Sequence, residues 1–248
     1  MRTVSYIVAV HDEEDVLEPT TVRIAERLRS FPGSEVVLVE NGSADSSPAL
    51  VRRLAADLSS SEVVVKAAES EKGFGHALRR GIEVSSGDVL VLTAADLPFG
   101  FSDFDHVAPR FSERELVFGS KGHPDTRFPR PLSRRVLSSG FRLLRRRLLD
   151  LSVVDTQGTV LVGGRWARHV APYLECGDYL VTTELAAFAA RDGLCIREVP
   201  VTADDMGRRP SSVRPVRDSM RMLQGLIELR KRFADDGPLL ATRTLARP

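Results

Sequence analysis

The sequence predicts an α/β fold in which a mostly parallel sheet is flanked by helices. Three observations support this prediction. Apolar runs of strand length alternate with amphipathic helical patterns through the first hundred residues. The first of these runs, residues 4–10, is apolar apart from Ser5, as expected for a strand buried on both faces. The helical patterns between runs are long enough for right-handed crossovers between parallel strands.

The alternation gives the elements in order. In the first half we expect strands over residues 4–10, 35–39, 63–65 and 89–92, and helices over 14–30, 45–58 and 72–84. In the second half we expect strands over 116–119, 159–162 and 196–201, helices over 132–151, 181–192 and 213–233, and a loop over 121–131. We assign one domain to residues 1–236 and a loose tail to residues 237–248.

Two of these helices carry apolar stripes that we expect to face the core. The stripe of the helix over 132–151 consists of Leu137, Phe141, Leu144, Leu148 and Leu151. The stripe of the last helix consists of Val216, Met220, Leu223 and Ile227.

The amino-acid composition argues against some classes of protein. The 35 basic and 34 acidic residues balance, so no global field indicates a nucleic-acid partner. Two cysteines, Cys176 and Cys195, fit a reducing compartment, and neither a cleavable leader nor an apolar run of about 20 residues is visible. We therefore expect a cytoplasmic protein that at most sits on a membrane surface. The arginine-rich segment over 132–151 fits either an interfacial helix on anionic lipid or a helix docked with its arginines in solvent.

Polar clusters follow three of the expected strands, at residues 11–14, 40–43 and 94–96. Ligands of parallel sheets bind beyond the carboxyl ends of the strands, so these clusters should converge on one cleft. The sequence contains no nucleophile elbow, no H-E-x-x-H and no P-loop. A cleft of this kind suits a nucleotide sugar. Carboxylates after the first two strands can bind the nucleobase and ribose, and Asp96 is placed to hold Mg²⁺ or Mn²⁺ near the diphosphate.

Local chemistry offers a simpler explanation for each of these side chains. Asp96 could be a turn residue before Pro98, and Asp12 could cap the first helix. Glu14 could be present only because a negative charge is favourable near the N-terminus of a helix.

The order of motifs resembles the inverting family 2 glycosyltransferases, in particular the dolichyl- and polyprenyl-phosphate mannose and glucose synthase branch. "VAVHDEEDVL" is similar to the P-x-Y-N-E-E opening of that family, and "VVLVENGSADSS" to its V-V-D-D-G-S-x-D-x-T. "EKGFGHALRRGIEVSSGDVLVLTAADL" resembles N-x-G-x-G-x-A…G-D…D-A-D-L. "SVVDTQGTVLV", "TTELAAFAARDGLCIREVPV" and "RRPSSVRPVRDSMRML" resemble the D-T-Q-C-G-F, E-L-L…E-V-P-V and R…G-x-S-K segments. The resemblance runs from about residue 4 to 225.

This resemblance implies a GT-A fold, with a nucleotide-binding half over 1–100 and an acceptor and sugar half over 101–236. It places these residues around the nucleotide sugar: Val10, Asp12, Glu14, Glu40, Lys72, Gly73, Ala95, Asp96, Gln157, Arg208 and Arg214. It places Asp96, Asp155, Glu184 and Arg209 at the reacting centre, with Asp96 as the metal ligand. The alternatives are a glycine-rich helix start at Gly73, a polar turn at Asp155 and Gln157, a capping role for Glu184 and a solvated basic loop over 208–214.

The sequence also departs from the family pattern. Ala94 replaces the first carboxylate of the D-x-D, and Glu40-Asn41 replaces the aspartate pair. His11-Asp12 replaces the tyrosine and asparagine of the opening, and Gly158-Thr159 replaces glycine and phenylalanine. We expect a transferase that moves a hexose from a GDP- or UDP-sugar, with inversion, to a polyprenyl phosphate or another small acceptor. A nucleotide-sugar mutase and a non-catalytic nucleotide-sugar binder are the alternatives, and the oligomeric state is left open.

Overall fold

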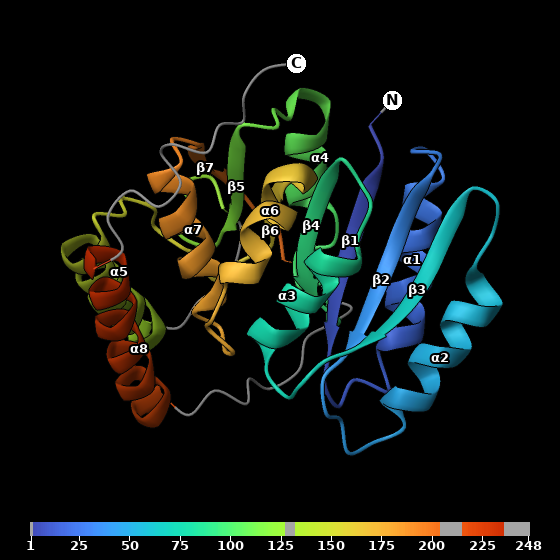
Figure 1. The fold of residues 1–248 in the computed structure, drawn as a ribbon, viewed down its shortest axis with the longest axis horizontal. Helices are drawn as coiled ribbons and strands as arrows, with labels where there is room; N and C mark the ends of the chain where they lie inside the picture. The colour runs from blue at the N-terminus through green and yellow to red at the C-terminus, as the bar shows by residue number, and fades with distance from the viewer. Residues whose placement is uncertain (1, 127–131, 204–214, 236–248) are drawn as a thin grey trace.

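The computed structural model describes residues 2–126, 132–203 and 215–235. Within them, seven strands form one sheet in the order β3-β2-β1-β4-β6-β5-β7. The strands are β1 (Val4–Val10), β2 (Ser34–Glu40), β3 (Val63–Glu69), β4 (Val89–Ala94), β5 (Glu115–Ser120), β6 (Val160–Gly163) and β7 (Cys195–Pro200). Every neighbouring pair is parallel except those of β6, which is antiparallel to β4 and to β5. The carboxyl ends of the six other strands therefore share one edge, at which β6 begins (Figure 1).

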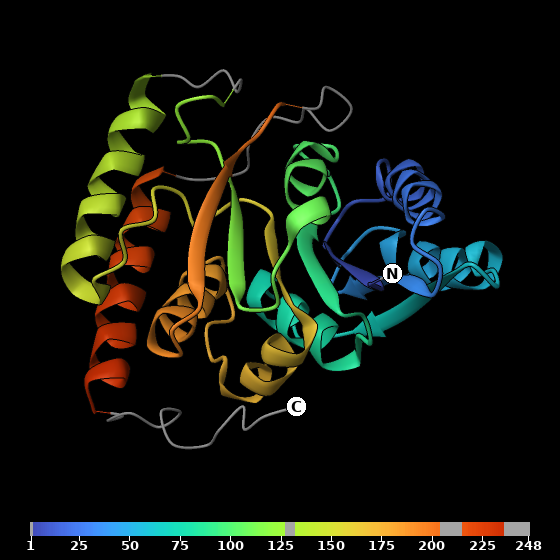
Figure 2. The same cartoon turned by 90° about the horizontal axis from the view of Figure 1, so that it is seen from above.

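Helices cover both faces of the sheet (Figure 2). One face is covered by α1 (Leu17–Leu28), α2 (Ser47–Leu58) and α4 (Ser102–Val107), and the other by α3 (Phe74–Val84), α6 (Gly164–Val170) and α7 (Val181–Arg191). The remaining helices, α5 (Leu132–Leu149) and α8 (Pro215–Asp235), lie side by side beyond the β7 edge (Figures 1 and 2).

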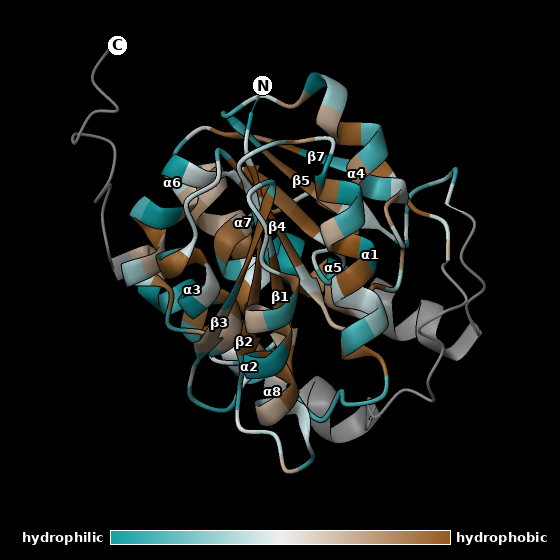
Figure 3. Cartoon of the chain, turned by 90° about the vertical axis from the view of Figure 1, so that its right-hand side faces the viewer, coloured by the Kyte–Doolittle hydropathy of each residue, from teal (hydrophilic) through white to brown (hydrophobic). Residues whose placement is uncertain are grey.

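The central strands are buried on both faces, as their apolar runs predict. Every residue of β1 and β2 is buried. Successive side chains alternate between two clusters, with Ile7 in the cluster under α3 and Val8 in the cluster under α1. Apolar residues accordingly concentrate on the strands and the inner helix faces (Figure 3). This α/β sheet with helices on both sides confirms the predicted fold class.

Some elements differ from the prediction. The third strand continues to Glu69, past the expected end at Val65, because its later residues pair with β2 at the sheet edge although a lysine and a glutamate interrupt the apolar run. The sequence did not indicate α4 and α6, which have 6 and 7 residues. Helices this short show too few turns for a periodic pattern, and the glycines at 163 and 164 are typical of a loop.

The predicted apolar stripes of the two outer helices are only partly buried, which corrects the expectation. On α5 Leu144 is 38% exposed while Arg145 is buried. On α8 Leu223 and Ile227 are exposed while Leu226 and Leu229 are buried. The side chains of Leu137, Val216 and Met220 lie outside the described part of the structure. Among the residues that the structure describes, no helix is long and apolar enough to cross a membrane.

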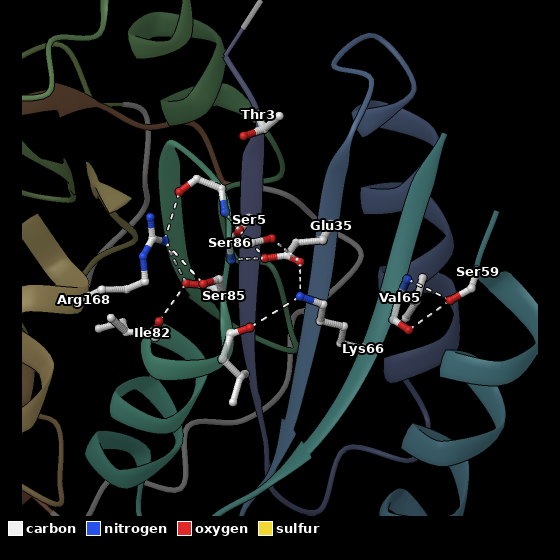
Figure 4. Close-up of polar contacts among 12 residues, drawn as sticks. Thr3, Ser5, Glu35, Ser59, Val65, Lys66, Ile82, Ser85, Ser86 and Arg168 are labelled. Atoms are coloured by element: carbon white, nitrogen blue, oxygen red, sulfur yellow. Dashed lines mark hydrogen bonds and ion pairs between the residues drawn. The ribbon is translucent and has the colours of Figure 1, made fainter. Parts of the chain in front are cut away.

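A polar network closes the amino-terminal edge of the sheet, opposite the edge at which most strands end (Figure 4). The Glu35 carboxylate accepts hydrogen bonds from the Ser5 hydroxyl and the Ser86 amide, both at 2.6 Å, and pairs with Lys66 at 2.5 Å. Burial alone would raise the pKa of Glu35, but these donors outweigh it and lower the pKa. Because the polar groups at this edge pair with one another, we assign them a structural role.

Candidate active site

The carboxyl ends of β1, β2 and β4 lie side by side. In the strand register Val10 of β1 pairs with Glu40 of β2, and Ala9 of β1 pairs with Ala94 of β4. The polar residues that follow each strand, 11–14, 41–43 and 95–96, therefore meet at one edge of the sheet.

Asp12 and Glu14 join the loop after β1 to the loop after β2. The Asp12 carboxylate accepts a hydrogen bond from the Ala44 amide at 2.7 Å, and the Asp12 amide donates one to the Ser43 hydroxyl at 3.0 Å. The Glu14 carboxylate accepts one from the Ser46 amide at 2.9 Å. With a φ of 56°, Asp12 adopts the left-handed conformation that aspartate tolerates better than most residues.

The simpler alternatives for these two residues do not fit the structure. The helix α1 begins at Leu17, and its N-cap is Val16, so Asp12 does not cap it. The acidic residue in the first turn of α1 is Glu18, and Glu14 precedes that turn, so the helix dipole does not explain Glu14. Both carboxylates belong to the loop at the strand ends, where a nucleotide contact stays a prediction.

Glu40 and Asn41 organise the end of β2. The Glu40 carboxylate is 9% exposed and accepts a hydrogen bond from the Ser43 amide at 2.6 Å. The Asn41 side chain donates to the Val10 carbonyl at 2.7 Å and accepts from the Gly73 amide at 3.2 Å. Asn41 therefore ties β1 and β2 to the start of α3. The Val10 side chain is fully buried, so any contact of Val10 with a ligand would use its backbone.

A hollow of about 430 Å³ opens beside Glu40 at the edge formed by β2 and β3. It is lined by Glu40, Pro48, Val51, Arg52, Ala67, Ala68, Glu69 and Arg80. The lining combines a nearly buried carboxylate, two arginines and small apolar side chains. The lining also contains Glu69, which pairs with Arg52 at 3.3 Å.

The glycines that begin α3 allow a close contact with the chain around Gly177. The Gly75 amide donates to the Gly177 carbonyl at 2.9 Å. A Cβ on Gly73 would lie 2.3 Å from that oxygen, and a Cβ on Gly75 would lie 2.0 Å from the Cys176 carbonyl oxygen. Gly73 also has a φ of 141°, which other residues rarely adopt. Lys72 is exposed immediately before this turn.

Asp96 lies just beyond β4 and is half-buried. The chain turns there, because the Leu97 amide donates to the Ala94 carbonyl at 3.2 Å and Leu97 has a φ of 38°. Ala95 has no exposed surface and packs in the core under α1, so a contact with a ligand would use its backbone. The turn and the ligand roles of Asp96 are compatible, since the turn lies at the strand-end edge and leaves the residue half-buried.

The donor set for a divalent cation is small in the part of the chain that the structure describes. Among residues 2–126, 132–203 and 215–235, no group of three or more His, Cys, Asp or Glu side chains could hold a metal. Mg²⁺ is often held by one or two carboxylates together with substrate phosphates and water. A single half-buried carboxylate at Asp96 fits that mode, in which the diphosphate supplies the remaining oxygens.

Asp155 and Gln157 lie at the same edge, in the loop that leads into β6. The Asp155 carboxylate accepts hydrogen bonds from the Lys121 amide at 3.2 Å and from the Gln157 amide at 3.0 Å. The Asp155 amide donates to Glu198 of β7 at 2.9 Å. The Gln157 side chain reaches the Met222 sulfur of α8 at 3.8 Å. Asp155 thus joins the ends of β5, β6 and β7.

Glu184 does not face the strand-end loops with an open carboxylate. It has no exposed surface, and it accepts hydrogen bonds from the Glu175 amide at 3.0 Å and the Cys176 amide at 2.9 Å. Arg232 of α8 pairs with it at 2.5 Å. Glu184 lies within α7 after the N-cap Leu180, which makes no side-chain cap. The alternative role of Glu184, capping its own helix, is therefore not the one seen, since its carboxylate contacts another segment.

Sequence reasoning missed three residues near this edge. Lys121 follows β5 directly, and the rule that ligands lie beyond strand ends would have selected it. Arg145, buried in α5, donates to Thr156 at 3.0 Å and to the Val153 carbonyl. No local pattern marks Arg145 or Arg232, because their partners are distant in the sequence or in a loop. The predicted phosphate ligands Arg208, Arg209 and Arg214 lie outside the described residues.

Comparisons with known proteins identify the family and the fold of the chain. The family described as glycosyl transferase family 2 matches residues 5–172. A dolichyl-phosphate beta-glucosyltransferase from Dictyostelium discoideum is 27% identical over 80% of this chain and 63% of its own length. The glycosyltransferase AglD of Haloferax volcanii is 28% identical over 88% of this chain and 35% of its own length. The chain thus spans less than two thirds of these relatives.

Solved structures share the fold at low sequence identity. Glucosyl-3-phosphoglycerate synthase from Mycobacterium tuberculosis, crystallised with UDP, has a TM-score of 0.62 at 19% identity, over 93% of this chain and 80% of its own. The same enzyme crystallised with Mn²⁺, UDP-glucose and phosphoglyceric acid has a TM-score of 0.60 at 19% identity, over 92% of this chain and 78% of its own. The fold is the GT-A fold that the resemblance implied, and the chain belongs to glycosyl transferase family 2.

Proposed function

We propose that this chain transfers a hexose from a GDP- or UDP-sugar, with inversion, to a polyprenyl phosphate or another small phosphorylated acceptor. The observation that carries the proposal is the meeting of Asp12, Glu40 and Asp96 at one sheet edge in a chain of this family. Glu40 and the hollow beside it would receive the nucleobase, and Asp12 and Glu14 the ribose. Lys72, Gly73 and the backbone of Val10 and Ala95 would border the rest of the donor.

The departing diphosphate needs its growing negative charge neutralised. Asp96 would hold Mg²⁺ or Mn²⁺ there, and the cation would supply Lewis-acid stabilisation of the diphosphate oxygens. Arg208, Arg209 and Arg214 would add bidentate donors to the same charge. The relatives crystallised with Mn²⁺ and UDP support divalent-metal use in the family without identifying the ion for this chain.

The acceptor would approach from the second half of the chain. A phosphate is already a nucleophile at neutral pH, so the reaction needs no strong general base. Asp155 and Gln157, at the joint edge of β5, β6 and β7, would orient the sugar or the acceptor, and the neighbouring Lys121 would supply a positive charge. The names of the relatives, one acting on dolichyl phosphate and one on phosphoglycerate, support a phosphorylated acceptor.

A lipid acceptor would bring the protein to a membrane surface from the cytoplasm. The outer helices support this contact, because α5 exposes Leu143 and Leu144 and α8 exposes Leu223 and Ile227. Arginines 142, 146 and 147 are exposed on the same stretch of α5. Exposed apolar side chains among arginines favour an anionic lipid surface. Sedimentation with anionic but not with neutral vesicles is expected, and sedimentation with neither would contradict the contact.

The test is an incubation of the protein with a panel of GDP- and UDP-sugars, with Mn²⁺ or with EDTA, resolved by chromatography. Each donor is run alone, with a short polyprenyl phosphate and with 3-phosphoglycerate. Free nucleoside diphosphate that appears only with an acceptor, together with a glycosylated product, is the expected result. A new species of unchanged mass without free diphosphate would instead indicate a mutase. Nucleotide binding without turnover of any donor would indicate a binder.

A further inference from the structure

A buried ion pair connects α7 and α8 to the segment before α7. The Glu184 carboxylate receives the amides of Glu175 and Cys176 at 3.0 and 2.9 Å and the Arg232 guanidinium at 2.5 Å. Arg232 also donates to the Tyr173 carbonyl at 2.5 Å. Two adjacent amides and one carbonyl of residues 173–176 are thus held by one pair of side chains.

The same segment sets the position of the first turn of α3. The Gly177 carbonyl accepts the Gly75 amide at 2.9 Å, and the contact at Gly75 is too close for any side chain. Phe74 stacks on Tyr179 with ring centroids 4.9 Å apart and 27° between the planes. Because this contact is backbone against backbone, a displacement of residues 175–178 must be passed on to residues 73–75.

The first turn of α3 continues the contact to the strand ends. The Gly73 amide donates to the Asn41 side chain at 3.2 Å, and that side chain donates to the Val10 carbonyl at 2.7 Å. A continuous chain of hydrogen bonds and close contacts therefore runs from α8 through Glu184, residues 175–178 and α3 to the ends of β1 and β2 (Figure 1 shows these elements).

Glu184 is poorly placed to act on a substrate itself. It has no exposed surface, and the backbone amides and Arg232 together occupy both of its oxygens. A carboxylate that accepts a proton or orients an acceptor must present an open oxygen to it.

We propose that Glu184 and Arg232 are positioning residues, which place the 175–178 segment and, through it, the first turn of α3 at the nucleotide site. This inference rests on the proposed function for the identity of the ligand. The geometry that it invokes also predicts a local change in backbone protection that needs no ligand.

The test compares Arg232→Met with Arg232→Lys and with Arg230→Met. Met keeps an apolar stem beside Phe188 and Phe233, whose rings the guanidinium covers at 5.6 and 5.8 Å. Arg230 is an exposed arginine on the same helix and serves as the matched control. UDP and GDP affinities are measured by calorimetry, amide hydrogen exchange is followed by mass spectrometry, and kcat and KM are measured for the donor.

Arg232→Met is expected to weaken nucleotide binding by about tenfold, as small displacements of a binding group do. Exchange should accelerate at residues 73–77 and 173–178, whereas kcat at saturating donor should change little. Arg232→Lys should recover part of the affinity, and Arg230→Met should match the wild type. Glu184→Gln should behave like Arg232→Met.

Three results would overturn the inference. Unchanged affinity and unchanged exchange in Arg232→Met would show that the ion pair positions nothing. Faster exchange spread over β1, β2 and β4 alike would show a general loss of stability. A large loss of kcat in Glu184→Gln at unchanged nucleotide affinity would make Glu184 a catalytic residue. If the wild type bound no nucleotide, the proposed function would fail, while the exchange data would still decide the positioning role.

Discussion

Three carboxylates at the strand ends stabilise the loops around them through hydrogen bonds from backbone amides. Asp12, Glu14 and Glu40 each accept a hydrogen bond from a backbone amide of residues 43–46. The position of these residues at the sheet edge could be predicted, because an apolar strand followed by a polar cluster can be recognised in the sequence alone. The sequence could not show that Glu184 is buried against Arg232, since 48 residues separate the partners and no motif joins them.

Asp103 is a buried carboxyl that the proposed chemistry does not use. It is 1% exposed in α4, its Oδ1 accepts the Phe104 amide at 2.7 Å, and a Cβ on Gly119 would lie 2.8 Å from its Oδ2. Burial raises the pKa of Asp103 from 3.8 to about 6. Between these two pH values the folded protein keeps a proton that the unfolded chain has lost. The free energy of unfolding therefore falls as pH rises through this window.

We expect Asp103→Asn to remove this pH dependence. The free energy of unfolding of the variant, minus that of the wild type, should increase by about 2.5 kcal/mol between pH 4 and pH 8, because most of a pKa shift of roughly two units takes effect in this range. Urea titrations of both proteins at the two pH values measure the difference. A difference that is the same at pH 4 and pH 8 would show that Asp103 ionises as it does in the unfolded chain.

At the scale of elements, α5 shows where pattern reasoning succeeds and where it stops. The 3.6-residue period located the helix, but burial follows its docking partner rather than its own most apolar stripe. Arg145 is buried because Thr156 and the Val153 carbonyl receive its donors. Burial lowers the pKa of Arg145, and the charges of Asp155 and Glu198 oppose that effect. No periodicity could reveal such a contact with a loop.

Arg145→Met should destabilise the protein and loosen the loop that carries Asp155. Removing the guanidinium leaves the hydroxyl of Thr156 and the carbonyl of Val153 without this donor, which costs about 2 kcal/mol in the free energy of unfolding. Arg146→Met, an exposed change on the same helix, is the control. Denaturant titration measures both variants. Equal stability of the two would mean that the buried contacts contribute nothing, as replacement of a buried charge by an apolar group sometimes allows.

At the scale of the whole molecule, the first half was more predictable than the second. Continuous apolar strands and regular crossovers gave the parallel half directly. The reversal of β6 was not visible, because the buried sequence VLVG reads the same in either direction of pairing. The motifs of the second half were assigned from their resemblance to the family pattern. The structure of the second half therefore depends more on contacts between residues distant in sequence. The residues proposed to bind the acceptor lie in this half.

We propose that the edge formed by β1, β2 and β4 holds the diphosphate of a nucleotide sugar against Asp96. The most direct measurement is kcat/KM of Asp96→Asn with the best donor and acceptor of the panel, beside Asp57→Asn, an exposed change on α2. Both variants should unfold at the wild-type temperature. We expect a loss of about a hundredfold or more for Asp96→Asn and none for Asp57→Asn. Activity of Asp96→Asn within twofold of the wild type would contradict this proposal.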